Sequence, residues 1–203
     1  MLFRSLVASF GFYDQFRSSV NNTIHQLAEA NTNTRILSGD HKDVVIHMMN
    51  QLEIPTTHDE DNEDSNQAVF SGEEIRQRMD GMFAVKLVDD CKVIEFESSE
   101  MQTKFKQLRK QVRAVYRCTP DVKELFLAGL SQLTTCAVTG HLADDVPAIK
   151  QASVGFTLGK CGCDLARASG DVIILDDDFN SIYNAVQWGR KDRKSTRLNS
   201  SHT

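Results

Sequence analysis

The chain has 203 residues, of which 40% are hydrophobic and 25% charged, and its formal net charge is −5. These values are ordinary for one globular domain, and the acidic balance argues against a nucleic-acid partner because no basic patch dominates. No apolar run approaches the roughly 20 residues that a membrane-crossing helix needs. The five cysteines form no Cys-x-x-Cys pair, so we expect reduced, packed thiols and a cytosolic setting.

The first part of the chain alternates helical and extended patterns. Apolar residues at helical spacing predict an amphipathic helix within residues 11–30, and a short strand follows over 32–37. Ser38-Gly39-Asp40 ends this strand as a turn. A second helix is predicted from 41 to 52, and Pro55 stops it.

The middle of the chain begins with a polar, acidic stretch over residues 55–67, which has no periodicity and predicts a solvated loop. A calcium-binding loop is a weaker alternative, because no glycine or closing glutamate stands at the required spacing. A helix is predicted over 72–82. Two strands over 83–88 and 92–96 then flank a short acidic turn.

Two helices and a strand are predicted next. Ser98 or Ser99 caps a helix that runs to about residue 110, and the strand lies over 113–117. Thr119-Pro120-Asp121 is a typical helix start, with a capping residue, a proline at the first helical position and an acid in the first turn.

The stretch from Thr135 to Gly159 has the pattern strand, acidic loop, short helix, strand. This order is typical of an α/β fold, which places polar groups at the carboxyl ends of its strands. The adjacent carboxylates Asp144 and Asp145 suit a hard divalent cation, which prefers oxygen ligands. The alternative interpretation is a helix cap followed by a solvated loop.

The chain ends with a predicted strand over 172–175, an acidic turn and a helix over 180–189. Residues 191–203 are polar, rich in serine and arginine, and aperiodic. This tail looks like translated sequencing-adapter sequence, so we expect it to be non-native and disordered. We also expect it to contribute nothing to the core.

Five ordered motifs resemble those of the P-type cation-transporting ATPases, over roughly residues 11–190. The segment Thr139–Lys150, T-G-H-L-A-D-D-V-P-A-I-K, is similar to the family's T-G-D-G-x-N-D-x-P-A-L-K. The first of the other four motifs has two parts: D-x-x-R-x-x-V, which begins at Asp14, and Ser38-Gly39-Asp40, which corresponds to the family's T-G-D. The remaining three are Ser71–Arg76, which corresponds to T-G-E-E-F-R, Arg117–Lys123, which corresponds to R-x-x-P-x-x-K, and Gly162–Phe179, which corresponds to the family's closing G-x-D motif. The amino-acid sequence of residues 139–190 is most similar to that of the calcium-transporting branch of the family.

The resemblance implies a haloacid-dehalogenase-like α/β fold, with a Rossmann-like parallel sheet and helices on both faces. Residues 1–190 would form the later, partial stretch of the cytoplasmic phosphorylation domain, without the family's central strand. We therefore expect the isolated chain to be loosely packed or prone to aggregate. The expected partners are the rest of the pump chain: its nucleotide-binding domain, actuator domain and membrane helices. The parent would lie at the cytoplasmic face of a membrane, and the fragment itself would be soluble.

The resemblance also implies roles for individual residues. Lys123 would stabilise the transferring phosphoryl group, and Ser38 would contact phosphate through its hydroxyl. The implied nucleotide- and phosphate-binding set is Ser38, Gly39, Asp40, Arg117 and Lys123, and the implied metal ligands are Asp145 and Asp144. Without the resemblance, the sequence predicts only a surface lysine on a helix at Lys123 and an ordinary turn at Ser38-Gly39-Asp40.

Two positions in the metal-binding motif depart from the family. The family's first Asp is His141 here, and the Gly after it is Leu142. The chain also contains no D-K-T-G-T, the motif whose Asp accepts phosphate from ATP with Mg²⁺. We therefore expect these 203 residues alone to form no acyl phosphate. The alternatives are a catalytically inactive paralogue that serves as a phosphate-binding or interaction module, and, less favoured, a stand-alone phosphatase.

Overall fold

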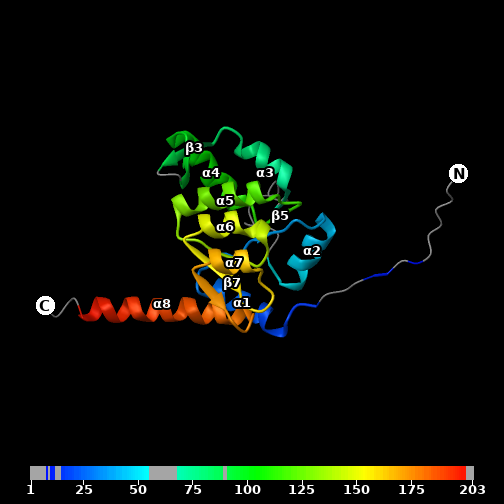
Figure 1. Ribbon diagram of the computed structural model, residues 1–203, viewed down its shortest axis with the longest axis vertical. Helices are drawn as coiled ribbons and strands as arrows, with labels where there is room; N and C mark the ends of the chain where they lie inside the picture. The colour runs from blue at the N-terminus through cyan, green and yellow to red at the C-terminus, as the bar shows by residue number, and fades with distance from the viewer. Residues whose placement is uncertain (1–7, 9, 12–14, 55–67, 89–90, 200–203) are drawn as a thin grey trace, which may run out of the picture.

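The computed structural model describes residues 8, 10–11, 15–54, 68–88 and 91–199, and Figure 1 shows how their elements are arranged. Helices and strands alternate, as the sequence pattern predicts. The elements are α1 Ser18–Glu29, β1 Ile36–Leu37, α2 Lys42–Gln51, β2 Val69–Ser71, α3 Gly72–Met79, β3 Phe83–Val88, β4 Cys91–Phe96, α4 Ser99–Gln111, β5 Ala114–Tyr116, α5 Pro120–Leu133, β6 Ala137–Gly140, η1 Ala143–Asp145, α6 Val146–Gln151, β7 Val154–Leu158, α7 Asp164–Ser169, β8 Val172–Ile174 and α8 Phe179–Asn199.

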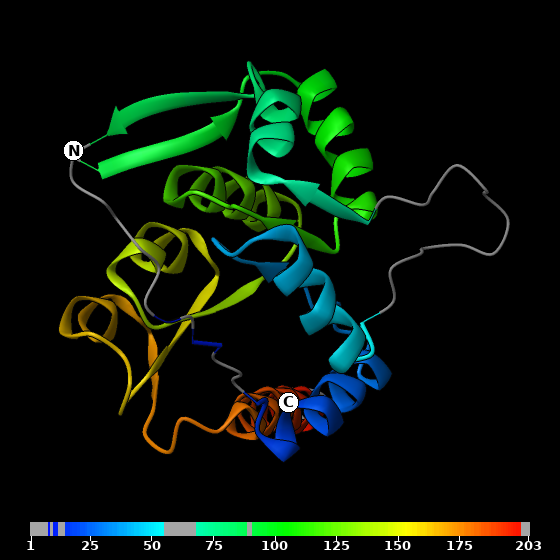
Figure 2. The same ribbon diagram turned by 90° about the vertical axis from the view of Figure 1, so that its right-hand side faces the viewer.

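The strands form two parallel sheets and one antiparallel hairpin. The first parallel sheet has the order β1-β5-β2 and the second has the order β6-β7-β8. The expected single parallel sheet is therefore divided in two, because β1 and β6 are not paired with each other. The hairpin of β3 and β4 lies at the opposite end of the molecule from α1 and α8, as Figures 1 and 2 show.

Helices cover both faces of each parallel sheet. In the first sheet, Val115 packs into a cluster with residues of α3, α4 and α5, whereas the adjacent Ala114 packs against residues of α1 and α2. In the second sheet, Val138 contacts the cluster of α6 and α7, and Phe156 packs against α8. Successive strand residues point to opposite faces, so each sheet has an apolar layer on either side. The fold is the α/β architecture that the sequence predicts.

The largest apolar cluster joins the hairpin to the first sheet. Four phenylalanine rings stack or meet edge to face with centroids 4.9–5.7 Å apart: Phe83, Phe96, Phe105 and Phe126. Gly129 of α5 makes room for them, because a Cβ at this position would lie 2.6 Å from the ring of Phe105. This contact explains a glycine in the interior of an otherwise apolar helix.

Most element boundaries match the sequence expectations, with three differences. The first helix begins at Ser18 and not near residue 11, and Arg17 occupies its N-cap in extended geometry. The residue Thr119 precedes α5 as predicted, but its side chain makes no capping hydrogen bond. The acidic stretch 55–67 and the family-matched Asp14 lie outside the described residues.

The third difference concerns the end of the chain. Helix α8 continues through Asn199 and does not end near Gly189, so its backbone enters the segment that was expected to be disordered. The segment 190–199 contains neither proline nor glycine, and its arginines and lysines are good helix formers, so the helix can extend. Whether this extension contributes to stability stays a prediction, which deletion of residues 191–203 tests through the thermal midpoint.

Candidate functional site

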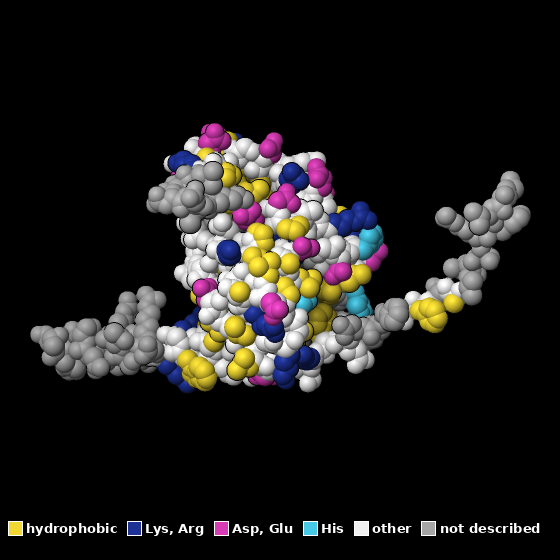
Figure 3. Space-filling view, in the orientation of Figure 1, with side chains coloured by type: hydrophobic (Ala, Val, Ile, Leu, Met, Phe, Trp, Pro, Cys, Tyr) yellow, Lys and Arg dark blue, Asp and Glu magenta, His cyan; other side chains and the backbone are white. Residues whose placement is uncertain are grey.

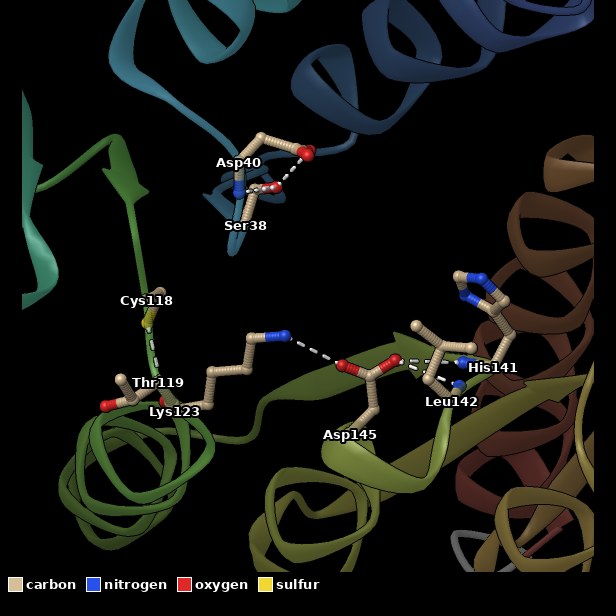
Figure 4. A network of polar contacts seen from close by, with 8 residues as sticks. All are labelled: Ser38, Asp40, Cys118, Thr119, Lys123, His141, Leu142 and Asp145. Carbon is tan, nitrogen blue, oxygen red and sulfur yellow. Dashed lines mark hydrogen bonds and ion pairs between the residues drawn. The ribbon is translucent and has the colours of Figure 1, made fainter. Parts of the chain in front are cut away.

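A partly buried ion pair lies at the carboxyl ends of the parallel strands. Lys123, in the first turn of α5, places its Nζ 2.8 Å from Oδ1 of Asp145, which ends the η1 turn after β6. The two side chains are only 14% and 16% exposed. Figure 4 shows Lys123 reaching from α5 towards Asp145. An ion pair shielded from solvent in this way interacts more strongly than a surface pair.

The second carboxylate oxygen of Asp145 organises its own loop. Oδ2 accepts hydrogen bonds from the backbone N–H groups of His141 and Leu142, at 3.1 and 3.2 Å. Burial alone would raise the pKa of Asp145, but the bonds from Lys123 and from these two amides outweigh it and lower the pKa. Asp145 is therefore held as a carboxylate with both oxygens engaged.

The close approach of Asp145 depends on Gly140 at the end of β6. A Cβ at Gly140 would lie 2.6 Å from the Cβ of Asp145 and 3.0 Å from Cδ1 of Ile149. These distances are shorter than van der Waals contact, so any larger side chain would push the loop away from Lys123. The glycine of the motif's T-G pair thus has a structural reason in this chain.

We predict that Gly140→Ala destabilises the protein by about 1–3 kcal/mol, the usual cost of forcing an extra methyl into a packed site. Urea unfolding should show a lower midpoint with an unchanged slope. Gly189→Ala is the matched control, because a Cβ there meets nothing within 4 Å and alanine favours the helix. Equal midpoints for Gly140→Ala and the wild type would contradict the packing argument.

Figure 4 shows Ser38 and Asp40 near the Lys123–Asp145 pair, with no contact drawn between the two groups. The hydroxyl of Ser38 donates to Oδ2 of Asp40 at 2.6 Å and accepts from the N–H of Asp40 at 3.1 Å. The turn is fixed to the strand end of β5, because Ser38 O accepts from the N–H of Cys118 and Asp40 O from that of Arg117. The structure therefore brings Ser38 and Asp40 to the same end of the fold as Lys123 and Asp145.

Two other predicted residues lie apart from the ion pair. The side chain of Arg117 is exposed and lines a separate hollow of about 330 Å³ beside Gly72 and Arg76. Its backbone has a φ of 47°, and its carbonyl oxygen would lie 2.4 Å from a Cβ at Gly72, which accounts for the glycine of the Ser71–Arg76 motif. Asp144 is exposed on the η1 turn.

The donor set of the described residues does not suffice for a magnesium ion. Both oxygens of Asp145 are engaged by Lys123 and two amides, and Figure 4 shows no contact between the imidazole of His141 and the pair. Within the described ranges, no group of three or more His, Cys, Asp or Glu is placed to hold a metal ion. Mg²⁺ prefers about six oxygen ligands, so ligands other than the described residues, water among them, would have to complete such a site.

Sequence reasoning matched the acidic turn 176–178 to the family without assigning it a role, and the structure shows one. The carboxylate of Asp177, a residue 6% exposed, accepts from the N–H groups of Lys160 and Cys161 at 3.0 and 2.9 Å. Its carbonyl oxygen accepts from the guanidinium of Arg17, and Asp178 accepts from the hydroxyl of Ser19. The turn thus connects α1, the β7–α7 loop and α8.

The backbone hydrogen bonds from Lys160 and Cys161 lower the pKa of Asp177 to about 2. Because its folded pKa lies below the ordinary carboxyl value, the carboxylate stabilises the fold above about pH 4, and this contribution is lost as the pH falls towards 2. We predict that Asp177→Asn lowers the thermal midpoint at pH 7. The amide nitrogen of the asparagine would face the N–H group of Lys160 or Cys161, and two donors cannot form a hydrogen bond with each other. The difference from wild type should shrink between about pH 4 and pH 2.

Asp164→Asn provides the control, because that side chain is 94% exposed. A thermal midpoint of Asp177→Asn equal to that of wild type at pH 7 would contradict the assigned role. A difference that stays constant down to pH 2 would show that the charge of Asp177 is not what stabilises the turn.

Comparison with solved structures identifies the class of fold. The chain superposes with a TM-score of 0.60 on a zinc-transporting PIB-type ATPase in its E2.Pi state, with 16% sequence identity. The superposition covers 92% of this chain and 21% of the zinc-transporting ATPase. At this identity the likeness concerns the fold alone. The fold is therefore that of a P-type ATPase cytoplasmic domain, with the haloacid-dehalogenase-like arrangement of parallel strands between helices.

Proteins with similar sequences show which P-type ATPases the chain resembles. The calcium-transporting ATPase 2 of Saccharomyces cerevisiae is 28% identical over 181 residues, which cover 89% of this chain and 13% of that protein. The calcium-transporting ATPase 2 of Schizosaccharomyces pombe is 40% identical over 97 residues, 47% of this chain and 7% of that protein. No model of a protein family matches the chain. Its homologues are thus calcium-transporting P-type ATPases, and the chain spans only a small share of their length.

Within the described residues, no helix has both the length and the apolar character needed to cross a bilayer. On the face seen in Figure 3, charged side chains of both signs are interspersed with apolar ones, and no single charge dominates.

Proposed function

We propose that this chain is part of the phosphorylation domain of an ATP-driven calcium pump at the cytoplasmic face of a membrane. In this proposal, phosphate passes from ATP to an aspartate outside these 203 residues. The observation that carries it is the partly buried Lys123–Asp145 pair, which lies at the same end of the strands as Ser38. The names of the sequence relatives favour calcium as the transported ion.

The residues of this chain would act by position and charge. The ammonium group of Lys123 offsets negative charge on a transferring phosphoryl group, and Asp145 holds that ammonium in place. Ser38 has a hydroxyl that is free to exchange its bond to Asp40 for one to phosphate oxygen. ATP and Mg²⁺ would bind mainly through parts of the parent outside this chain, since the described donor set is incomplete.

A chimeric pump tests this function directly. Residues 15–190 replace the matching segment of the Saccharomyces cerevisiae calcium-transporting ATPase 2, and the chimera is incubated with γ-labelled ATP and quenched in acid. We expect an acid-stable label on the chimera and ATP-dependent calcium uptake into vesicles. A folded, membrane-inserted chimera without label would contradict the proposed phosphoryl transfer.

The second candidate is an inactive paralogue that binds phosphate or a partner without catalysis. It is favoured by His141 and Leu142, which occupy the metal-ligand and glycine positions of the motif. In that case the chimera should fold and insert but gain label only after both residues are restored to Asp and Gly. The chimera and its restored variant therefore separate the two candidates.

A further inference from the structure

Five cationic side chains line one end of a hollow of about 870 Å³ and form a cationic cluster: Arg35, Arg109, Lys110, Arg113 and Arg190. Arg35 stands directly before β1 and Arg113 directly before β5, and these two strands are parallel neighbours. The cluster therefore lies at the amino ends of the strands, whereas the ion pair of the candidate site lies at the carboxyl ends. Its members come from three separate parts of the chain, so the fold assembles it and no single basic run does.

Hydrogen bonds to neutral oxygens hold the two inner members of the cationic cluster. Arg35 donates to the backbone carbonyls of Arg109 and Val112, at 3.0 and 3.1 Å, and so satisfies carbonyls at the end of α4. Arg113, a residue 8% exposed, donates to Oδ1 of Asn33 at 3.1 Å. These bonds fix the directions of both guanidinium groups, but they leave the positive charges in place.

Carboxylates of the described residues do not balance the cationic cluster. Asp145 is the one carboxylate among the described residues that line the hollow, and it is paired with Lys123. Within the described ranges, Arg109 and Lys110 make no ion pair with a carboxylate. The negative end of the α4 macrodipole supplies only about half an elementary charge. The described residues therefore leave most of this positive charge uncompensated, in a chain whose formal net charge is −5.

Repulsion within the cationic cluster acts on Arg35. Burial, and after it the positive charges of Arg113 and Arg109, lowers the pKa of Arg35 to about 10. Burial also lowers the pKa of Arg113. Arg35 nevertheless stays protonated at pH 7, so the fold keeps like charges close together. An anion bound among them would relieve that repulsion.

Phosphate groups suit this arrangement. A guanidinium presents a planar fork of N–H donors that can bind two oxygens of one phosphate. A phosphomonoester carries about −1.5 to −2 charges at pH 7, so two or three such groups neutralise the five cations of the cluster. The hollow has room for a molecule of this size, because pockets for small molecules commonly measure about 300–1,000 Å³.

We propose that the cationic cluster binds a molecule that carries two or three phosphate groups. Arg35 and Arg113 bind the inner phosphate, and the exposed side chains of Lys110 and Arg190 bind the groups that lie nearer the solvent. A soluble polyphosphate and the headgroup of a phosphorylated lipid offer the same chemistry, and the experiment separates these two sources. The site lies at the other end of the strands from Ser38, and the proposal holds whether or not the chain serves phosphoryl transfer.

The test uses the full chain and inositol 1,4,5-trisphosphate, which is also the headgroup of phosphatidylinositol 4,5-bisphosphate. Calorimetric titration should show saturable binding that weakens as the salt concentration rises. In NMR spectra, the Nε–H signals of Arg35 and Arg113 should shift, whereas that of Arg76, which pairs with Asp121 on another face, should not. Binding without shifts of the Arg35 and Arg113 signals would overturn the proposal.

Further probes identify the source of the phosphate groups. Phosphatidylcholine vesicles with phosphatidylinositol 4,5-bisphosphate are compared with vesicles of phosphatidylcholine alone in a sedimentation assay. Binding of the free trisphosphate but not of the lipid vesicles supports a soluble polyphosphate, and tighter binding to the lipid vesicles supports a lipid headgroup. Binding of neither would overturn the proposal. A hexaglutamate peptide should bind at least tenfold more weakly than the trisphosphate, and equal affinity would show that the cluster selects acidic peptides by charge alone.

Matched protein variants locate the site. Arg109→Gln with Lys110→Gln removes two cations of the cluster and should weaken binding of the trisphosphate at least tenfold. Lys104→Gln with Lys106→Gln removes the same charge from the same helix, outside the hollow, and should leave the affinity unchanged. Equal affinities of the two double variants would contradict a site at the cluster.

Two single variants complete the test. Arg35→Lys keeps the charge but loses the fork of donors, so we expect weaker binding. Because this change also removes bonds to the end of α4, circular dichroism must show that the variant is folded. Ser38→Ala alters the carboxyl end of the strands and should leave the affinity unchanged. A loss of binding in Ser38→Ala equal to that in Arg109→Gln with Lys110→Gln would place the phosphate groups at the Ser38 turn and overturn the proposal.

Discussion

Replacing Lys123 with alanine in the chimeric pump is expected to lower the rate of phosphoenzyme formation by about 10²–10³-fold. This is the usual effect of removing one preorganised group that stabilises charge in a transition state, about 2.7–4 kcal/mol. The side chain of Lys123 is 14% exposed and its ammonium lies 2.8 Å from Asp145, so solvent cannot replace it at low cost. Rapid-quench measurement with γ-labelled ATP gives the rate.

Controls separate catalysis from folding. Lys104→Ala removes a lysine of α4 whose exposed side chain pairs with Glu100, and it should leave the rate unchanged. Lys123→Arg keeps the charge but changes its geometry, so we expect a partial loss. Thermal unfolding of each variant shows whether Asp145, left without its cation, destabilises the domain. A Lys123→Ala chimera that folds and phosphorylates at the original rate would show that Lys123 has no part in the chemistry.

Local patterns predicted most elements because each has a physical cause within a few residues. The proline in the first turn of α5 acts at short range. Ser71 does so as well, although it was not predicted as a cap: it forms a reciprocal capping box with Glu74 at the start of α3. The hairpin of β3 and β4 follows from two strand-like runs around a short turn. The division into two sheets has no such local signal, since it depends on which strands pair over long distances along the chain.

In the candidate site, too, sequence motifs predicted some residues, whereas contacts between distant residues were not predicted. The resemblance placed Lys123, Asp145 and Ser38 together, and the structure brings them to one end of the strands. It gave no role for Asp177, because that carboxylate acts through backbone amides 16 and 17 residues away. The sequence offers only a run of three aspartates after a strand, and the structure shows that the middle one, Asp177, adopts a φ of 55° that Asp tolerates better than most residues.

Restoring the family residues with His141→Asp and Leu142→Gly is expected to tighten Mg²⁺ binding to the chimera at least about tenfold, roughly 1.4 kcal/mol. A neutral imidazole is a poor ligand for a hard, strongly hydrated cation, and a protonated one repels it. The imidazole of His141 makes no contact with Asp145 in Figure 4, and Leu142, the next residue of the loop, is 52% exposed. Calorimetric titration with Mg²⁺ measures the binding without depending on turnover.

Asp144 decides how much binding the original sequence retains. It stands where the family has Asn, and it lies exposed on the η1 turn next to Asp145, so it adds a carboxylate close to the metal position. We therefore expect Asp144→Asn to weaken Mg²⁺ binding in the original chimera and to matter less in the restored one. If the original chimera binds Mg²⁺ as tightly as the restored one and Asp144→Asn abolishes that binding, then Asp144 has replaced the missing ligand. The case for an inactive paralogue would then lose its main support, because the substitution at His141 would be compensated within the same turn.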